Sequence, residues 1–256
     1  MVNKSFLTLL ILSIIFQGCQ KENLVSSAGF DDSFDLYSSV PDIFSMGKWT
    51  FHEQTYPENT LTLNSDTIHN GTKSIRMFAV ASDGPSVSKS GLASHSEVLF
   101  NEGDVLRVSC WFYIPQNDGI DKLVILDLED PAPISSGHGI RLMFDPDNAL
   151  FIERNKMGLS NITQPNQNKT TFTYNQWNNI VFELKLSTSR KGYVKLLQNG
   201  VTLIEEQSVK TMPKDRLYIT QGTSKTYRNV EVGITANSTG HAVIMFIDNF
   251  SIQKLN

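Results

Sequence analysis

The amino-acid sequence predicts an all-β protein folded as an antiparallel β-sandwich. Short runs rich in β-branched and aromatic residues recur along the chain, and turn residues separate them. No long segment shows the 3.6-residue periodicity of an amphipathic helix. A chain of 256 residues is long for one domain, but β-sandwiches commonly reach about 200–250 residues as one unit. One sandwich domain is therefore expected.

The clearest strand is the segment 105–115. Its even-numbered residues from 106 to 114 are all apolar or cysteine, and they alternate with a more polar set. Because successive side chains of a strand point to opposite faces, the even set is predicted to face the core. Arg107, Trp111 and Tyr113 are predicted to point outward or into a groove. The further predicted strands are 71–76, 122–129, 140–144, 149–154, 177–186, 193–197, 201–205, 230–235 and 242–252.

The sequence predicts the type of two of the connections between these strands. Asn199 and Gly200 predict a tight hairpin turn, since both tolerate the positive φ of such a turn. The segment 155–173 is polar and rich in Asn, and is interpreted as a long loop or lid.

The N-terminus has the pattern of a secretory signal. Lys4 precedes an almost unbroken apolar run over 6–16, which is shorter than the roughly 20 residues of a membrane-spanning helix. The Gly18–Cys19 junction that follows resembles the lipobox of bacterial lipoproteins, which implies cleavage before Cys19 and its acylation. We therefore expect a signal peptide at 1–18, a lipidated tether at 19–29 and the sandwich domain at 30–256.

Two alternatives to this N-terminal assignment stay open, an ordinary signal peptide with an incidental Cys19 and a transmembrane anchor. The lipoprotein interpretation places the domain in a bacterial cell envelope, outside the cytoplasm and on the outer membrane. Several acyl chains would hold it there, because each buried methylene contributes about 0.8 kcal/mol.

Composition excludes some partners. The formal net charge of −4 disfavours nucleic acid, whose binders normally carry a basic excess. Cys110 is the other cysteine, so a mature domain without Cys19 has no second partner for a disulfide, and its stability must come from its core.

The order of several segments resembles a known family. A strand at 71–76 is followed by aromatic and apolar residues at 111–115, then by 176–181, 191–200 and a closing segment at 247–252. This series resembles the concanavalin A-like jelly roll of bacterial polysaccharide lyases, of the heparin lyase I and glucuronan lyase type, over about residues 30–254. The resemblance implies a jelly-roll sandwich and a polysaccharide ligand. Most of the matched residues are strand, turn and core positions, and a shared fold does not by itself assign a function.

The candidate substrate-binding residues follow from strand faces. β-Elimination on a uronic acid needs a group that neutralises the carboxylate, a base and an acid. His95 and Glu97 alternate in a predicted strand, at a place where the resemblance implies an Arg and a Glu. Cations and aromatic rings on one concave surface would suit an acidic glycan. The candidates for this surface are Glu97, Arg107, Trp111, Tyr113, Arg141, Tyr193 and Lys195.

The catalytic strand departs from the family. The lyases tend to carry a late strand with a Lys and a Tyr that act in proton transfer, and its counterpart here is 230–235. Glu231 stands at the Lys position and Thr235 at the Tyr position. His95 or Tyr227, with Tyr193 as an alternative, would have to supply the catalytic groups. The carboxylate motif of jelly-roll glycoside hydrolases is missing from the sequence.

A structural Ca²⁺ is expected between the two ends of the domain. Acidic residues near the start, including Asp31, and Asp248 in the closing strand could supply oxygen ligands. The alternative is that these residues serve turns and caps.

Three functions therefore stay open. The first is binding of an extracellular, acidic polysaccharide with weak or no catalysis. The second is an active lyase that cleaves a uronic-acid glycan. The third is a structural lipoprotein without a glycan ligand.

Replacing the lipid acceptor tests the N-terminal assignment. We expect Cys19→Ser to move the protein from the membrane fraction to the soluble fraction, because the acyl chains are lost. Mass spectrometry of the unaltered protein should find acyl chains on Cys19. An unaltered protein that starts at another residue and carries no lipid would contradict the assignment.

Overall fold

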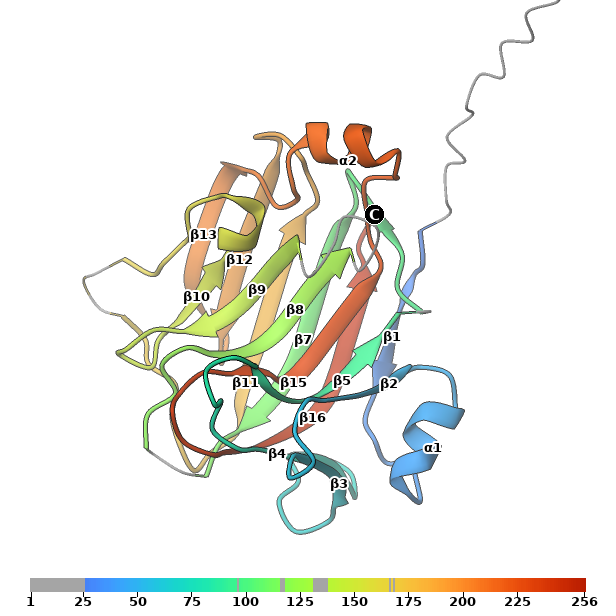
Figure 1. The fold of residues 1–256 in the computed structure, drawn as a ribbon, viewed down its shortest axis with the longest axis vertical. Helices are drawn as coiled ribbons and strands as arrows, with labels where there is room; N and C mark the ends of the chain where they lie inside the picture. Colours follow the sequence, from blue (N-terminus) through green and yellow to red (C-terminus); the bar gives the residue numbers. More distant parts are fainter. Residues whose placement is uncertain (1–25, 96, 116–117, 131–137, 166, 168) are drawn as a thin grey trace, which may run out of the picture.

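The computed structural model describes residues 26–256 except 96, 116–117, 131–137, 166 and 168, and it confirms the predicted sandwich. Two antiparallel sheets pack face to face (Figure 1). The larger sheet has eight strands in the order β13-β12-β11-β7-β16-β4-β3, with β1 paired to β16. Its strands are β1 (Gly29–Asp32), β3 (Thr60–Asn64), β4 (Ser74–Ala79), β7 (Val105–Tyr113), β11 (Asn178–Lys185), β12 (Gly192–Gln198), β13 (Val201–Val209) and β16 (Val243–Lys254).

The smaller of the two main sheets has six strands in the order β10-β9-β8-β15-β5-β2. They are β2 (Phe51–Gln54), β5 (Ser88–Ser94), β8 (Leu123–Asp130), β9 (His138–Phe144), β10 (Leu150–Glu153) and β15 (Asn229–Asn237). A two-stranded sheet of β6 (Phe100–Asn101) and β14 (Thr226–Tyr227) completes the set.

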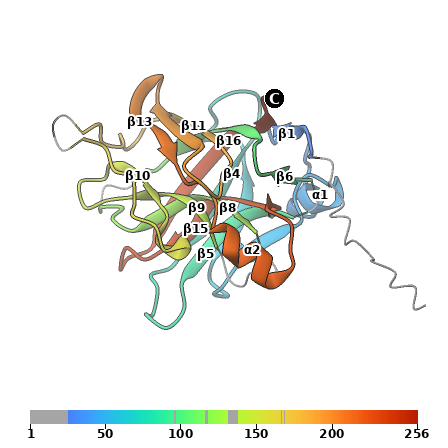
Figure 2. The same cartoon turned by 90° about the horizontal axis from the view of Figure 1, so that it is seen from above.

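Helices are few and short within the described part of the chain. They are α1 (Val40–Ser45), α2 (Asp215–Gln221) and the 3₁₀ turn η1 (Asn155–Met157). Both α-helices lie at the periphery of the sandwich (Figures 1 and 2). None of the described helices is long and apolar enough to cross a membrane.

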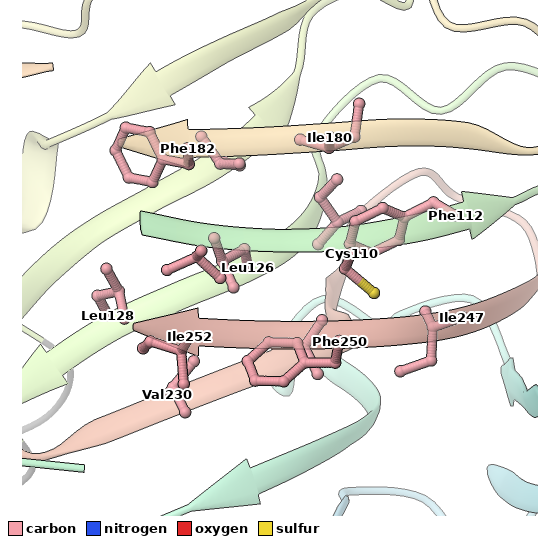
Figure 3. Close-up of a cluster of buried hydrophobic side chains, with 14 of the residues drawn as sticks. Cys110, Phe112, Leu126, Leu128, Ile180, Phe182, Val230, Ile247, Phe250 and Ile252 are labelled. Atoms are coloured by element: carbon pink, nitrogen blue, oxygen red, sulfur yellow. The ribbon is translucent and has the colours of Figure 1, made fainter. Parts of the chain in front are cut away.

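The core lies between the two main sheets, as the alternation of β7 predicts. Leu106, Val108, Cys110 and Phe112 are at most 2% exposed, whereas the odd-numbered residues of β7 are half-buried or exposed. Figure 3 shows side chains of β7, β11 and β16 meeting those of β8 and β15. The buried thiol of Cys110 has a raised pKa, mainly because burial disfavours the thiolate.

Most of the predicted strands are present, and their ends agree to within a few residues. Asn199 and Gly200, with φ of 51° and 79°, form the predicted turn between β12 and β13. The sequence pattern did not predict the strands before residue 71, β5, β6, β14 or either α-helix. Each of these segments has at most seven residues, so periodicity carries little signal in them.

The first described residues are already in contact with the domain. The predicted tether included residues 26–29, but Ser26 Oγ donates to Asp104 Oδ2 (2.6 Å) and Ser27 N donates to Leu99 O (2.8 Å). Gly29 begins β1, which pairs with β16. Residues 26–29 thus already contact the domain; the rest of the predicted tether, with Cys19, and the signal peptide lie outside the described residues.

Asp32 links the segment after β1 to the core by hydrogen bonds. Its buried carboxylate accepts hydrogen bonds from Phe34 N (2.9 Å), Tyr37 Oη (2.5 Å) and Trp49 Nε1 (2.8 Å). Trp49 in turn packs against Phe250 of β16, with ring centroids 4.9 Å apart. The carboxylate thus joins the segment after β1 to the segment before β2.

We expect Asp32→Ala to lower the free energy of unfolding by about 3 kcal/mol, because three donors would lose a charged acceptor in a buried place. Asp31→Ala is the matched control: its side chain is exposed, and its loss should cost at most about 0.5 kcal/mol. Chemical denaturation of both variants measures the difference. Equal effects would show that the Asp32 hydrogen bonds contribute nothing specific.

Candidate functional site

The outer face of the six-stranded sheet carries a row of charged residues. Glu153 of β10 lies opposite Arg141 of β9, Arg141 opposite Asp127 of β8, and Asp127 opposite Glu231 of β15. Side chains directly opposite one another in adjacent strands are neighbours. Three consecutive strands and the sequence-distant β15 therefore place one charged side chain each in a line.

The row is tied together by ion pairs. Arg141 Nε pairs with Asp127 Oδ1, and Arg141 Nη2 lies 2.7 Å from Glu129 Oε1. Lys89 Nζ of β5 lies 3.1 Å from Glu231 Oε2 and 3.4 Å from Glu53 Oε2 of β2. Two cations thus hold four carboxylates.

Burial perturbs the carboxylates at the centre of the row. Asp127 is 2% exposed and Glu231 is 4% exposed. Desolvation raises the pKa of Asp127, and the nearby Glu129 adds to the rise while Arg141 opposes it. Desolvation likewise raises the pKa of Glu231, with Asp127 adding to the rise and Lys89 opposing it. These carboxylates are held below the surface rather than presented to a ligand.

A pocket of about 350 Å³ opens above one part of this face, a size typical of ligand sites. Four cationic side chains line it, and Glu153 is the one carboxylate among its lining residues. Met143 and Phe151 supply apolar surface. The cations are Lys89, Lys122, Arg141 and Lys156.

Lys156 is the most available of these cations. It lies in η1, is exposed, and forms no ion pair within the described residues. Partial desolvation, followed by repulsion from Arg141, lowers the pKa of its ammonium. The ammonium of Lys156 therefore brings to the pocket a positive charge that no ion pair within the described residues compensates.

Arg141 is the one predicted substrate-binding residue that lines this pocket. Thr235 also lines it, and Glu231 lies on the same face. Both residues thus occupy the face where the family resemblance implies a Tyr and a Lys.

His95 and Glu97 do not form the predicted strand pair. β5 ends at Ser94, so strand alternation stops before both residues. The His95 ring packs edge-on against Phe51, with centroids 4.8 Å apart, and burial lowers its pKa. Glu97 is exposed. Neither residue lines the pocket.

The other predicted binding residues lie on the outer face of the eight-stranded sheet. Arg107 pairs with Glu183 (2.8 Å) and Lys195 with Glu205 (3.2 Å), while Tyr193 Oη donates to Glu183 (2.9 Å). The core separates this face from Arg141, so the prediction of one shared concave surface was wrong. The residues concerned are Arg107, Trp111, Tyr113, Tyr193 and Lys195.

The aromatic residues of that outer face pack on one another. Trp111 stacks on His69 with centroids 3.6 Å apart, and Tyr113 contacts Trp177 at 5.6 Å and Phe246 at 5.8 Å. One face of the Trp111 ring is therefore occupied by His69.

Tyr227 lies inside the protein. It is 1% exposed, and its hydroxyl donates to Thr211 O (2.6 Å). Burial raises its pKa well above the ordinary value. The prediction that its hydroxyl acts on a substrate is not compatible with this position.

The acidic residues proposed for Ca²⁺ are satisfied by protein donors. Asp248 accepts from the backbone N–H groups of His69 (2.9 Å) and Asn70 (3.1 Å), and Asp31 accepts from Gln253 (3.2 Å). Among the described residues, no group of three or more His, Cys, Asp or Glu side chains is arranged to hold a metal. The structural Ca²⁺ expected at Asp31 and Asp248 stays a prediction.

Sequence reasoning missed Lys89, Lys122 and Lys156. Lys89 lies in β5, where alternation with buried residues carried a weak strand signal. Lys156 lies within the segment interpreted as a loop or lid, and nothing in its local pattern relates it to Arg141.

Glu231→Gln tests the burial of charge on this face. Because the pKa of Glu231 is raised above 4.5 in the folded protein, its ionisation opposes folding at higher pH. We expect the variant to have a higher Tm at pH 7, with the gain disappearing as the pH falls below about 4.5.

Glu53→Gln is the matched control, since it removes the other carboxylate beside Lys89 from a more exposed position. We expect a smaller change in its Tm. A lower Tm for Glu231→Gln at pH 7 would show that its ion pair outweighs its desolvation.

Comparison with known proteins places this chain in a family. The fold is similar to endo-β-1,4-glucuronan lyase from the fungus Trichoderma reesei, with a TM-score of 0.65 and 16% identity over 88% of this chain and 94% of that chain. An alginate lyase from Aplysia kurodai has a TM-score of 0.58 and 13% identity over 90% of this chain and 100% of that chain. The cellulose induced protein Cip1 has a TM-score of 0.57 and 15% identity over 87% and 96% of the two chains.

At such identities these likenesses show the fold alone, and a search of curated proteins found no match. The family model for polysaccharide lyases matches residues 44–251, well over half of the chain. Any enzymatic activity is accordingly expected to be that of a lyase. The chain belongs to the polysaccharide lyase family.

Proposed function

We propose that the protein binds an acidic polysaccharide in the pocket on the outer face of its six-stranded sheet. The observation that carries this proposal is the set of cations that line the pocket: Arg141 and Lys89 are paired with carboxylates, whereas Lys122 and Lys156 form no ion pair within the described residues. A uronic acid presents one carboxylate per sugar, and charge-assisted hydrogen bonds to a cation are among the stronger polar contacts.

The cations have different roles in this proposal. Arg141 is oriented by Asp127 and Glu129, so its remaining N–H groups are held in a defined direction. Lys156 is not committed to a carboxylate of the protein and supplies net positive charge. Met143 and Phe151 offer apolar surface for a sugar ring.

Binding without strong catalysis is favoured by the residues of β15. The family resemblance implies a Lys and a Tyr where this chain has Glu231 and Thr235. Thr235 Oγ1 donates to Val124 O (3.2 Å), and a hydroxyl of this kind does not ionise near neutral pH. Among the described residues, no tyrosine lines the pocket.

An active lyase is the second candidate, and Lys156 favours it. A general base works best when its pKa is close to the working pH, and the pKa of Lys156 is lowered towards that range. In this alternative, the neutral amine of Lys156 removes the proton next to the carboxylate, a carbon–carbon double bond forms as the bond to the glycosidic oxygen breaks, and the resulting ammonium gives the proton to the departing oxygen. Arg141 neutralises the carboxylate. Of the two types that the sequence resembles, the glucuronan lyase type is favoured by the fold likeness to the fungal enzyme.

The proposal also includes the setting of the protein. Acylation at Cys19 would hold the domain on the outer membrane, where extracellular polysaccharides are accessible. The support for this part is the N-terminal sequence pattern alone.

We expect Lys156→Ala to weaken binding of an oligouronate by roughly tenfold, the effect of losing a charge-assisted hydrogen bond. Lys214→Ala removes an exposed lysine of the segment before α2 and is the matched control. Calorimetric titration measures both, and a carboxyl-reduced oligosaccharide should bind poorly to every variant. Unchanged affinity in Lys156→Ala would contradict the assigned pocket.

The same variants separate binding from catalysis. Lys156→Arg keeps the positive charge but cannot act as a base near neutral pH. If the protein only binds, the ultraviolet absorbance of unsaturated sugars stays flat with uronic-acid polymers. A rise that Lys156→Arg abolishes, with binding retained, would establish the lyase instead.

A further inference from the structure

A second pocket lies on the other side of the turn that carries Lys156. It has a volume of about 490 Å³ and lies between the turn 154–161 and the end of β13. Asn155, Lys156 and Asn161 line the first pocket, whereas Arg154, Leu159 and Ser160 line the second. One short turn therefore separates the two pockets.

Arg154 places a buried cation at the second pocket. The residue is 9% exposed. Its Nε and Nη2 donate to Ser160 O (3.0 and 2.6 Å), and its Nη1 donates to Lys210 O (2.7 Å). A guanidinium has five N–H groups, so two remain without a partner among the described residues.

Among the described residues, no carboxylate forms an ion pair with this guanidinium. Glu206 is the one acidic residue that lines the second pocket, and no ion pair joins it to Arg154. Desolvation lowers the pKa of Arg154, and the negative charge of Glu206, which forms no ion pair with it, opposes this effect. Burial of a cation against neutral carbonyl oxygens is costly unless an anion completes its surroundings.

The backbone on the opposite wall is shaped by a β-bulge. Tyr193 pairs with Gln207 and Gly192 pairs with Val209, so Ser208 is the extra residue of β13. Its φ is 59°, a conformation that residues other than Gly, Asn and Asp seldom adopt. Bulges of this kind redirect side chains and are frequent beside functional sites.

Two further cations line the same pocket. Arg190 belongs to the β11–β12 turn and is exposed, and Lys210 follows β13. Neither forms an ion pair within the described residues. The second pocket thus combines three cations with one carboxylate.

We propose that the second pocket is an additional subsite for a carboxylate-bearing sugar of the same polymer, bound by Arg154, Arg190 and Lys210. A chain that lies across β9 and β10 in the first pocket reaches the second by passing over the turn 154–161. The proposal rests on the proposed function, because it assigns a second contact to the same acidic polysaccharide. Lys156 and Arg154 then hold carboxylates on opposite sides of the turn.

The test compares a uronic-acid polymer with its disaccharide on the full-length protein. Arg190→Ala/Lys210→Ala removes the two cations that do not hold the turn in place. Lys214→Ala/Arg216→Ala is the matched control, since it removes one Lys and one Arg that are exposed at the start of α2. Affinity of each variant is measured for both ligands and for the carboxyl-reduced polymer.

We expect the affinity of the Arg190/Lys210 variant for the polymer to be at least roughly fivefold lower than that of the control variant. The change in affinity for the disaccharide should be much smaller, because linked contacts strengthen only a ligand that spans both pockets. Binding of the carboxyl-reduced polymer should not distinguish the two variants.

Three results would overturn the proposal. Equal polymer affinities of the two double variants, with Lys156→Ala still weakening binding, would remove the second subsite and leave the first pocket in place. An equal loss of affinity for the polymer and for its disaccharide in the Arg190/Lys210 variant would show that these cations do not form a separate subsite. Absence of polymer binding by the unaltered protein would remove the proposed function together with the subsite.

Discussion

The placement of Arg141 between Asp127 and Glu129 is the interaction on which the outer face of the six-stranded sheet depends. Both carboxylates come from β8, and the guanidinium comes from the neighbouring β9. Breaking such a buried group of charges by removing one partner leaves an uncompensated charge, which costs several kcal/mol. The register between β8 and β9 and the direction of Arg141 are therefore determined together.

This arrangement also places the negative charges deeper below the surface than the positive ones. The carboxylates of Asp127 and Glu231 are buried, while Lys89, Lys122, Arg141 and Lys156 reach the pocket. A protein with a net negative charge of −4 can in this way offer a locally cationic surface. Local geometry, more than overall composition, decides which ligand charge is favoured.

The two outer faces of the sandwich differ in what they can bind. On the eight-stranded sheet, Arg107 and Lys195 are paired with carboxylates, and His69 covers one face of Trp111. On the six-stranded sheet, the turn after β10 adds Lys156 and Arg154 beside two pockets. The polar segment interpreted as a loop or lid thus contributes directly to the candidate site, although no regular pattern marks it in the sequence.

The sequence by itself determined the fold class, most of the strands and the residues of β7 that face the core. These follow from period-two alternation and turn chemistry, which are local properties of the chain. The grouping of Arg141, Lys89 and Lys156 was decided only by tertiary structure. They lie on β9, on β5 and in η1, and strand order and register between distant segments bring them together. For the same reason, alternation alone could not reveal that Arg107 and Arg141 face opposite sides of the sandwich, or that β5 ends before His95 and Tyr227 turns inward. Alternation shows which residues share a face of one strand, but the packing of two sheets decides which of those faces meets the core and which meets a ligand.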